Sequence, residues 1–395
     1  SEYILITRKS IQVFFRYKTL LEKHLKELAE LCSEENGKTY GESVAEIEKC
    51  IELTEFATSL PQLVTGEVLE VSKGVECRTE HVPLGVVASI VPFNFPAMVP
   101  NWTIPNAIAL GNCMIIKPSE KVPLSCGRLA ELLKEAGLPD GVINLVFVDG
   151  PTIGEVVFNH RDFAGIHFTG STGVFNKMWE TIGKNMAMYR SYPRIVGETG
   201  GKDFVIAHKS ADPDVVVTAL ARGAFEYQGQ KCSAASRAYI PSNMAAEVKK
   251  KLVEQVKTMR MGTVEDFTNF INAVIDEKSF DKLEGYIKNA RKKNSGAKIW
   301  VGGKCDKTEG FFIEPTIIEA SDPHYVTMCE ELFGPILTVY IYDENKYEET
   351  LKLVDSTSDY ALTGAIIAQD RYAIELATSR LRNSAGNFYI NDKPT

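Results

Sequence analysis

Short apolar segments alternate with helical patterns along most of this chain, and that alternation constrains the fold more than any other feature. Between residues 84 and 183 the apolar segments read as strands, separated by stretches with apolar residues at helical spacing. Strands that alternate with helices form a parallel sheet with right-handed crossovers. The expected strands are 86–91, 114–116, 142–147 and 165–168, and the expected helices are 97–110, 122–136, 151–158 and 173–183.

A second alternating region runs from about 203 to 390. Its expected strands are 203–207, 237–240, 298–301, 336–341 and 365–368. A chain of 395 residues is too long for one small core, so we expect two domains with a boundary near Gly200-Gly201. The predicted fold class is α/β, with two Rossmann-like, doubly wound parallel-sheet domains.

The N-terminal part has a different pattern. Apolar residues at helical spacing predict a helix over 8–35 and a second over 42–58. The period then changes, and residues 67–71 and 75–81 predict a hairpin around Lys73-Gly74.

Composition excludes several classes of function. The net charge of −8 and the lack of a Lys/Arg run argue against nucleic acid as a partner. No apolar stretch approaches the ~20 residues of a membrane helix. The eight cysteines are scattered without paired spacing, which favours free thiols in a reducing compartment over disulfides or a metal site. No signal-like region precedes the first helical pattern and the chain ends just after a strand-like run, so we expect it to be a fragment.

Two motifs point to covalent chemistry. Cys232 follows Gly229-Gln230-Lys231, and Glu198 stands 34 residues earlier, before Thr199-Gly200-Gly201-Lys202. A cysteine is more often a small core residue, but its glycine and polar neighbours here argue against an apolar site. Glu198 alone could belong to an ordinary turn. Together they suggest a nucleophile and a general base.

Four further motifs lie at strand ends or turns. They are Pro92–Pro96, which contains Asn94; Lys117–Glu120; Phe168–Thr172, which opens a helix; and Glu331–Pro335. Each could be a simple turn or a solvated loop. However, parallel sheets bind ligands at the carboxyl ends of their strands, and a helix N-terminus attracts phosphate.

The six motifs, in this order from 92 to 335, resemble those of the aldehyde dehydrogenase superfamily. The resemblance implies that Cys232 is the nucleophile and that Glu198 activates water. It implies that the Asn94 amide stabilises the oxyanion together with the Cys232 backbone N–H. The same resemblance implies an NAD site, in which the cofactor contacts are Lys117, Glu120, Gly170, Ser171, Glu331 and Phe333.

The Glu120 carboxylate would repel a 2′-phosphate and thus favours NAD over NADP. The chain departs from the superfamily pattern at Thr199, where leucine is usual. It departs again at Phe175 and Asn176, where many members carry a later glycine.

Three sequence segments point to a particular branch of the superfamily. Residues 224–234, 274–280 and 385–393 resemble the branch that oxidises glutamate γ-semialdehyde to glutamate with NAD. In that branch Ser233 would hold the substrate carboxylate, and Phe95 would line the substrate site. Residues 92–98 and 117–120 look more like the branch that converts methylmalonate semialdehyde and passes the acyl group to coenzyme A. Glu198 favours hydrolysis instead. A non-catalytic homologue is the third alternative.

The resemblance also implies an organisation. Residues 1–199 would form the NAD-binding domain, with an oligomerisation hairpin at about 66–82. Residues 200–386 would form the catalytic domain, and 387–395 would begin a C-terminal segment that the chain does not complete. We therefore expect a small aldehyde substrate, a homodimer or larger homo-oligomer, and no metal, membrane or nucleic acid. The expected location is the cytoplasm, or the mitochondrial matrix in a eukaryote.

Overall fold

The computed structural model describes the backbone of residues 2–395 and the side chains of residues 10–395. The chain divides into two compact units. The first unit comprises Ser1–Asn36 and Tyr40–Thr199, and the second comprises Gly37–Thr39 and Gly200–Thr395.

The first unit is built on a five-stranded sheet in the order β5-β4-β3-β6-β7, with every pair parallel. The strands are β3 (Val86–Ile90), β4 (Cys113–Lys117), β5 (Ile143–Leu145), β6 (Phe163–Thr169) and β7 (Arg194–Glu198). The chain enters at β3, moves outward to β5 and then returns to place β6 beside β3. The strand order therefore reverses between β3 and β6, which is where such sheets bind ligands.

The four strands predicted here are confirmed, and β7 was missed. This edge strand is mostly exposed, so it has no apolar run to reveal it.

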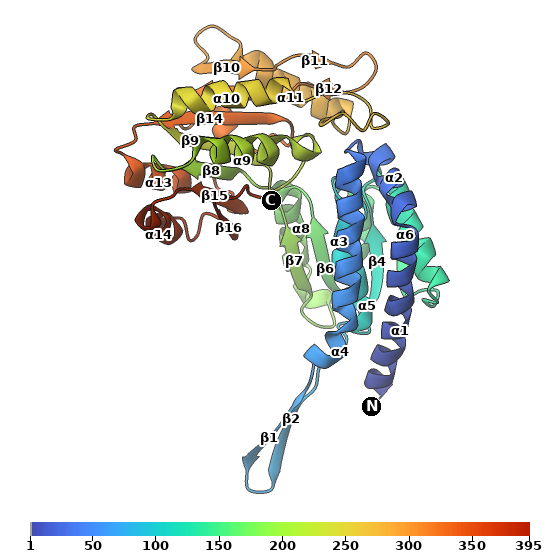
Figure 1. Ribbon diagram of the computed structural model, residues 1–395. Coiled ribbons are helices and arrows are strands. Elements are labelled where there is room, and N and C mark those ends of the chain that lie inside the picture. The colour runs from blue at the N-terminus through green and yellow to red at the C-terminus, as the bar shows by residue number, and fades with distance from the viewer. Residues whose placement is uncertain (1) are drawn as a thin grey trace. The chain divides into compact units, whose positions relative to one another are not determined.

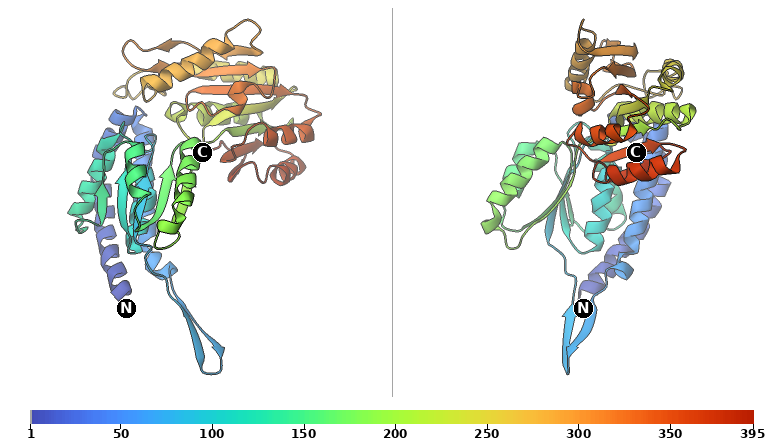
Figure 2. Two further views of the ribbon diagram at one scale, coloured as in Figure 1. Left: turned by 180° about the vertical axis from the view of Figure 1, so that it is seen from behind. Right: turned by 90° about the vertical axis from the view of Figure 1, so that its left-hand side faces the viewer.

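Helices cover both faces of this sheet (Figure 1 and Figure 2, right). On one face, a large apolar core joins the sheet to α1 (Glu2–Lys23), α2 (Leu25–Asn36), α3 (Tyr40–Thr58), α5 (Met98–Ala109) and α6 (Pro123–Glu135). On the other face, a smaller core joins it to α7 (Gly150–Val157) and α8 (Thr172–Lys184). Burial on both faces explains why the central strands read as continuous apolar segments.

The prediction of a single helix over 8–35 is wrong, because the structure has two helices there: α1 ends at Lys23 and α2 begins at Leu25. His24 forms a turn between them. Its N–H still donates to the Leu20 carbonyl, and the Leu28 N–H donates to the His24 carbonyl, both at 2.9 Å. Apolar spacing cannot reveal an irregularity that leaves the helical path almost continuous.

The predicted hairpin is confirmed. After the short helix α4 (Leu60–Leu63), β1 (Glu67–Ser72) pairs antiparallel with β2 (Val75–Thr79). The hairpin projects from the rest of the first unit (Figures 1 and 2), and all its strand residues are exposed, including Val68, Leu69, Val71 and Val75.

The second unit contains a seven-stranded sheet in the order β10-β13-β14-β9-β8-β15-β16. The strands are β8 (Asp203–Ala207), β9 (Ala235–Pro241), β10 (Ala297–Val301), β13 (Thr316–Ala320), β14 (Ile336–Tyr342), β15 (Thr363–Ile367) and β16 (Asn387–Ile390). All pairs are parallel except β10 with β13, which are antiparallel. The predicted parallel sheet is thus confirmed, with an antiparallel strand at one edge. β16 pairs with β15, so residues expected to begin a separate segment complete this sheet.

Helices also cover both faces of the second sheet. One core contains α9 (Pro213–Phe225) and α10 (Ala245–Lys257), and the core on the other face contains α12 (Val326–Cys329), α13 (Tyr347–Ser356) and α14 (Arg371–Arg380). A third core packs α11 (Glu277–Ala290) against Leu332 and Ile336. β11 (Cys305–Asp306) and β12 (Phe312–Ile313) form a small separate ladder.

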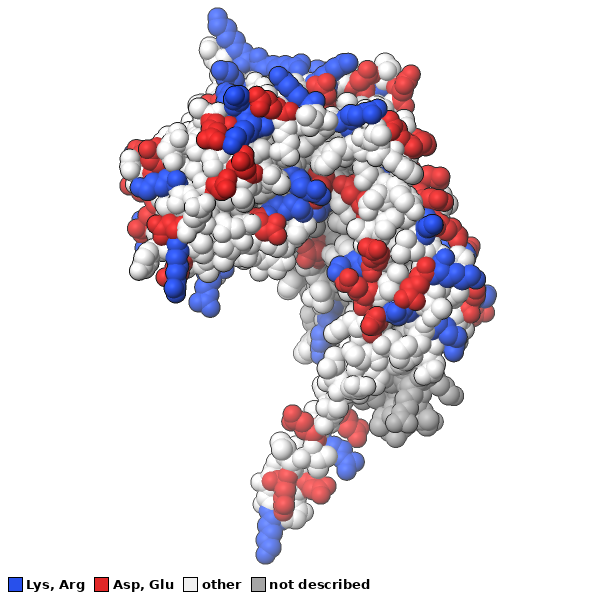
Figure 3. Space-filling view, in the orientation of Figure 1, with Lys and Arg blue, Asp and Glu red and all other residues white. Residues whose placement is uncertain are grey.

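The surface carries both signs of charge. Acidic and basic side chains are interspersed over the face shown in Figure 3. Among the helices of residues 2–395, none combines the length and apolar character needed to cross a bilayer. All eight cysteines lie in the described part of the chain, and none forms a disulfide.

Candidate active site

Four of the motifs predicted from sequence lie at one edge of the first sheet. Asn94 follows β3, Lys117 ends β4, Gly170 follows β6 and Glu198 ends β7. Because these strands are parallel neighbours, their carboxyl ends share one edge of the sheet. The structure therefore brings together residues that are separated by more than a hundred positions in sequence.

The loop that carries Asn94 is held from the helical layer. The Asn36 side-chain amide donates to the Phe93 carbonyl at 2.8 Å. The Glu46 carboxylate accepts the N–H groups of Ala97 and Met98, both at 2.8 Å, at the start of α5. A carboxylate at a helix N-terminus satisfies unpaired N–H groups and is favoured by the helix dipole.

Burial fixes this loop further. Asn94 is only 4% exposed and Phe95 only 9%. Glu46 is equally buried, at 2%. Sequence reasoning missed Asn36 and Glu46, because nothing in a helical pattern distinguishes a polar residue that supports a distant loop.

Lys117 and Glu120 form a pair at the end of β4. The Lys117 ammonium donates to the Pro118 carbonyl at 2.9 Å and to the Glu120 carboxylate at 3.1 Å. Lys117 is buried, whereas the Glu120 side chain is 70% exposed. A hydrogen bond from its own backbone N–H, followed by Lys117, lowers the pKa of Glu120. The edge thus presents an ionised carboxylate to any ligand that binds there.

The turn after β6 opens helix α8. Ser171 occupies the N-cap position with an extended backbone, but its side chain makes no capping hydrogen bond. The Gly170 N–H donates to the Glu198 carbonyl at 3.1 Å, which ties this turn to the end of β7. A helix N-terminus that its own cap side chain does not satisfy is suited to phosphate oxygens.

Phe175, one of the departures from the superfamily pattern, has a packing role. Its ring stacks on Phe168 with centroids 5.7 Å apart and meets Trp179 edge-on at 5.6 Å. A Cβ at Gly197 would lie 2.2 Å from the Phe175 ring. The missing side chain at Gly197 therefore makes room for an aromatic residue between α8 and β7.

Glu198 is half-buried at the end of β7. Burial raises the pKa of its carboxyl above the ordinary value. A carboxylate becomes a better general base as its pKa approaches the working pH.

The remaining predicted residues lie in the second unit, also at one edge. Cys232 lies between the short helix η2 (Glu226–Gly229) and β9, and Glu331 and Phe333 lie just before β14. Gly200 and Gly201 precede β8. Because β14, β9 and β8 are parallel neighbours, these residues share the amino edge of the sheet. Ligands usually bind at the carboxyl edge of such sheets, so strand alternation alone did not predict this position for a nucleophile.

Both glycines allow close packing at this edge. The Gly201 N–H donates to the Glu331 carboxylate at 3.0 Å. A Cβ at Gly200 would lie 2.4 Å from that carboxylate, and a Cβ at Gly201 would lie 2.2 Å from the Cys232 carbonyl oxygen. Burial raises the pKa of Glu331, and the Gly201 N–H opposes this shift.

The backbone before Cys232 is strained. Tyr227, Gln228 and Gly229 have φ values of 56°, 56° and 64° in succession. For residues other than glycine, this left-handed conformation costs roughly 1–2 kcal/mol each. A Cβ at Gly229 would lie 2.2 Å from the Gly334 carbonyl oxygen, so glycine is required there. Strain of this kind is concentrated at functional sites, where surrounding contacts maintain it.

Side-chain amides maintain the turn. The Gln228 amide donates to the Gly37 carbonyl at 3.2 Å, and the Gln230 side-chain oxygen accepts the Ile275 N–H at 2.9 Å. Both glutamines are almost fully buried. Ile275 belongs to the segment 274–280, one of those that resemble the glutamate semialdehyde branch.

Buried charges lie behind the amino edge of the second sheet. Burial lowers the pKa of Lys202 to about 7 and raises the pKa of Asp203 to about 7. Within the described part of the chain, the Lys202 ammonium has no hydrogen-bond partner. Asp203 accepts the N–H and hydroxyl of Thr363 at 2.6 and 2.8 Å.

Arg237 is the third buried charge. It is 1% exposed, and it donates to the Lys202 carbonyl at 2.7 Å. The Thr363 hydroxyl also reaches the Ser233 carbonyl at 3.5 Å, and Ser233 itself is buried. The motif that begins at Glu198 includes Lys202, but no pattern in the sequence distinguishes Asp203 or Arg237 as buried charges.

The profile of the aldehyde dehydrogenase family matches residues 6–395, almost the whole sequence. The chain belongs to this family.

Named relatives and solved structures agree with this membership. The mitochondrial Δ1-pyrroline-5-carboxylate dehydrogenase of Dictyostelium discoideum is 53% identical over 313 residues, covering 79% of this chain and 56% of the relative. The human enzyme of the same name is 42% identical over 356 residues, covering 89% and 63%. The chain therefore spans less than two thirds of the length of these relatives.

Among solved structures, that of the Mycobacterium tuberculosis Δ-pyrroline-5-carboxylate dehydrogenase bound with NAD is similar. It matches with a TM-score of 0.88 and 38% identity, covering 98% of this chain and 72% of the other.

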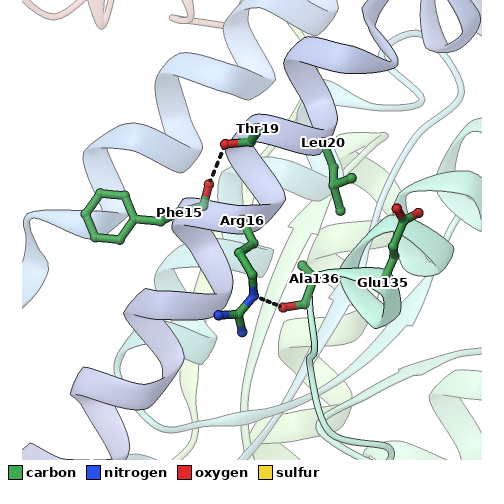
Figure 4. Close-up of a pocket in the computed structure, with 6 residues that line it drawn as sticks. All are labelled: Phe15, Arg16, Thr19, Leu20, Glu135 and Ala136. Atoms are coloured by element: carbon green, nitrogen blue, oxygen red, sulfur yellow. Dashed lines mark hydrogen bonds between the residues drawn. The ribbon is translucent and has the colours of Figure 1, made fainter.

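Two cavities of this chain differ in whether predicted site residues line them. One of about 10 Å³ lies beside the strained turn and is lined by Gly201, Gly229, Lys231, Ala234, Ser236, Glu331, Leu332, Phe333, Gly334 and Ile336. A larger one, of about 380 Å³, lies between α1 and the end of α6 (Figure 4). There the Arg16 guanidinium donates to the Ala136 carbonyl at 2.6 Å, and none of the predicted site residues lines the cavity.

Proposed function

We propose that this chain carries the catalytic and cofactor-binding parts of an NAD-dependent aldehyde dehydrogenase. Its substrate would be L-glutamate γ-semialdehyde, the open form of Δ1-pyrroline-5-carboxylate, and its product L-glutamate, as in proline degradation. The observation that carries this proposal is the strained, tightly held turn that presents Cys232. The similarity to Δ1-pyrroline-5-carboxylate dehydrogenases, up to 53% identical, supports the substrate.

In this proposal Cys232 forms the covalent intermediate. Its thiolate adds to the aldehyde carbon, and the carbonyl oxygen becomes an oxyanion. The Asn94 amide and the Cys232 backbone N–H stabilise that charge, and removal of one such donor typically costs ~10²–10³ in rate. The burial of Asn94 supports this role, because a fixed dipole stabilises a developing charge without rearranging.

When NAD is bound, it supplies the hydride acceptor. Loss of hydride from the tetrahedral adduct leaves a thioester on Cys232. Glu198 then takes a proton from water, whose oxygen attacks the thioester carbon, and the thiolate leaves as glutamate is released. The raised pKa of Glu198 supports this role.

The residues at the carboxyl edge of the first sheet fit a dinucleotide. The Lys117–Glu120 pair offers a donor and an ionised acceptor for ribose hydroxyls, and Ser171 leaves the start of α8 without a side-chain cap. We assign Gly170 and Ser171 to the pyrophosphate, and Glu331 and Phe333 to the nicotinamide end. The first unit would thus be the NAD-binding domain and the second the catalytic domain.

We assign Ser233 to the carboxylate of the semialdehyde and Phe95 to the apolar part of the same substrate site. The exposed apolar residues of the β1–β2 hairpin support a role in forming a homodimer or larger homo-oligomer. We place the enzyme in the cytoplasm, or in the mitochondrial matrix in a eukaryote; the mitochondrial relatives of Dictyostelium discoideum and human support the second location.

The test measures reduced cofactor formed from glutamate γ-semialdehyde, with and without coenzyme A, and repeats the measurement with methylmalonate semialdehyde. Turnover of the first substrate without coenzyme A, abolished in Cys232→Ala, is the expected result. A requirement for coenzyme A, or preference for methylmalonate semialdehyde, would favour the acyl-transferring branch. Cofactor binding without turnover of either aldehyde would favour a non-catalytic homologue.

A further inference from the structure

A buried carboxylate anchors the start of the strained turn that leads to Cys232. The Glu226 side chain is 11% exposed. Its Oε1 accepts the Arg222 guanidinium through Nε at 2.8 Å and Nη2 at 2.7 Å. Its Oε2 pairs with the Lys393 ammonium at 3.1 Å, and the Lys231 ammonium lies 4.0 Å away. Three cations from different parts of the second unit therefore face one carboxylate.

These contacts keep the carboxylate charged. Burial alone would raise the pKa of Glu226, but Lys393 and Lys231 outweigh it, and the net shift is downward. A buried ion pair that loses one partner leaves an uncompensated charge, so each member depends on the others.

Lys231, one of the two lysines that face Glu226, also contacts the strained turn. The Lys231 ammonium lies over the Tyr227 ring, 5.2 Å from its centroid, and the Lys38 ammonium lies over that ring at 4.9 Å. Tyr227 is the first of the three left-handed residues. The carboxylate, the lysine and the aromatic ring thus form one connected set immediately before Cys232.

Lys393 reaches Glu226 from the segment after β16. A Cβ at Gly223 in α9 would lie 3.4 Å from the Lys393 Cβ, so this segment packs directly on the helix that leads into the turn. Lys231 also donates to the Thr395 hydroxyl at 3.0 Å, which gives a second contact between the two segments. Glu226 and Lys393 lie in the two sequence segments, 224–234 and 385–393, that resemble the glutamate semialdehyde branch.

We infer that Glu226, held by Lys393, is a positioning residue that fixes the strained turn and balances the charge of Lys231 beside the nucleophile. The inference rests on the proposed role of Cys232. Neither residue takes part in bond making. Glu226 acts through the backbone of the turn and through Lys231, and Lys393 acts through Glu226.

Removing either partner should change the acidity of the Cys232 thiol in opposite directions. In Glu226→Gln the charge of Lys231 is no longer balanced, so the thiolate is favoured and its pKa falls. In Lys393→Met the Glu226 carboxylate keeps its charge with one cation fewer, so the thiol pKa rises. A single charge at intermediate dielectric supports shifts on the order of 0.5 pH unit.

The experiment follows alkylation of Cys232 by iodoacetamide across pH, quantified by mass spectrometry of the peptide that contains Cys232. The variants are Glu226→Gln, Lys393→Met, their combination and Lys393→Arg. We expect the pH midpoint of alkylation to be lower than in the wild type for Glu226→Gln and higher for Lys393→Met. The double variant and Lys393→Arg should have midpoints near the wild-type value. The first two should also slow formation of reduced cofactor by about tenfold, because the turn loses an anchor. Glu319→Gln is the matched control, since Glu319 also pairs with a lysine, at 3.3 Å, in the same unit.

The outcomes distinguish the proposed function, which depends on Cys232, from the positioning role of Glu226. If wild-type Cys232 does not react in preference to the other cysteines, the proposed function itself is contradicted. If it does react but Glu226→Gln and Lys393→Met leave the midpoint unchanged, or move it in one direction, this inference is overturned. A purely structural role would lower the melting temperature without opposite shifts. If Glu226→Gln does not fold, Lys393→Met and Lys393→Arg decide alone: a raised midpoint in the first only is the expected pattern.

Discussion

Gly201→Ala tests the packing that holds Cys232, the proposed nucleophile. A Cβ at Gly201 would lie 2.2 Å from the Cys232 carbonyl oxygen and 2.4 Å from the Asp203 carboxylate. The first of these atoms is backbone, and the second belongs to a buried carboxylate whose other oxygen accepts hydrogen bonds from Thr363, so neither can simply swing away. The methyl group must therefore displace the segment that carries Cys232.

The size of the effect follows from the distances. Ordinary contact requires more than 3.0 Å, so the Cys232 backbone must move by about 1 Å. Overpacking of this kind typically costs about 1–3 kcal/mol in the free energy of unfolding. A misplacement of about 1 Å at a reacting group typically costs about 10²-fold in rate. Catalysis should thus suffer more than stability.

The assay compares formation of reduced cofactor with denaturant unfolding, both at a temperature where all variants are folded. Gly285→Ala is the control, because Gly285 lies inside α11 with no atom within 4 Å of an added Cβ. Replacing a helical glycine with alanine removes backbone freedom from the unfolded chain. The free energy of unfolding of this variant should therefore rise by about 0.5–1 kcal/mol, and its rate of cofactor reduction should not change.

The refuting result is specific. If Gly201→Ala turns over at the wild-type rate with wild-type stability, the close approach of Gly201 to Cys232 does not control the nucleophile. Equal losses in Gly201→Ala and Gly285→Ala would instead reflect a general effect of glycine replacement.

Three further predictions concern deacylation, the choice of cofactor and the choice of aldehyde. Glu198→Gln should slow deacylation and produce a burst of reduced cofactor. In the wild type, deacylation should fall as pH drops through the raised pKa of Glu198, because only the carboxylate accepts a proton; a pH-independent rate would contradict this. In the wild type, kcat/KM should be higher with NAD than with NADP, and Glu120→Gln should lower the ratio of these two values. A wild-type preference for NADP would refute the role of Glu120. Ser233→Ala should lower kcat/KM for glutamate γ-semialdehyde by about ten- to a hundredfold but affect propionaldehyde far less, since a hydroxyl bonded to a carboxylate contributes about 1.5–3 kcal/mol. Equal losses on both aldehydes would show that Ser233 only supports Cys232.

The α/β architecture and the position of the first set of site residues were predictable from sequence. Strand and helix periods are local properties, and buried parallel strands are almost uninterrupted apolar runs. A residue that follows a strand must lie at that strand's carboxyl end, so Asn94, Lys117 and Gly170 could be placed at one edge before any packing was known.

Elements without a local signal were missed. β7 lies at an exposed edge and lacks an apolar run, so the sequence predicts no strand before Glu198. β13 was not among the expected strands. Its antiparallel pairing with β10 was not predicted either, because neighbour choice within a sheet depends on long-range contacts.

Only the tertiary structure decided how Cys232, the proposed nucleophile, is held. Cys232 could be chosen from its neighbours in sequence, but the left-handed turn before it is maintained by distant groups, including Gly37, Ile275 and Lys393. Isolated residues leave no periodic pattern. Their partners become evident only when the chain is folded, because a buried charge or amide must then find a partner, whatever its distance in sequence.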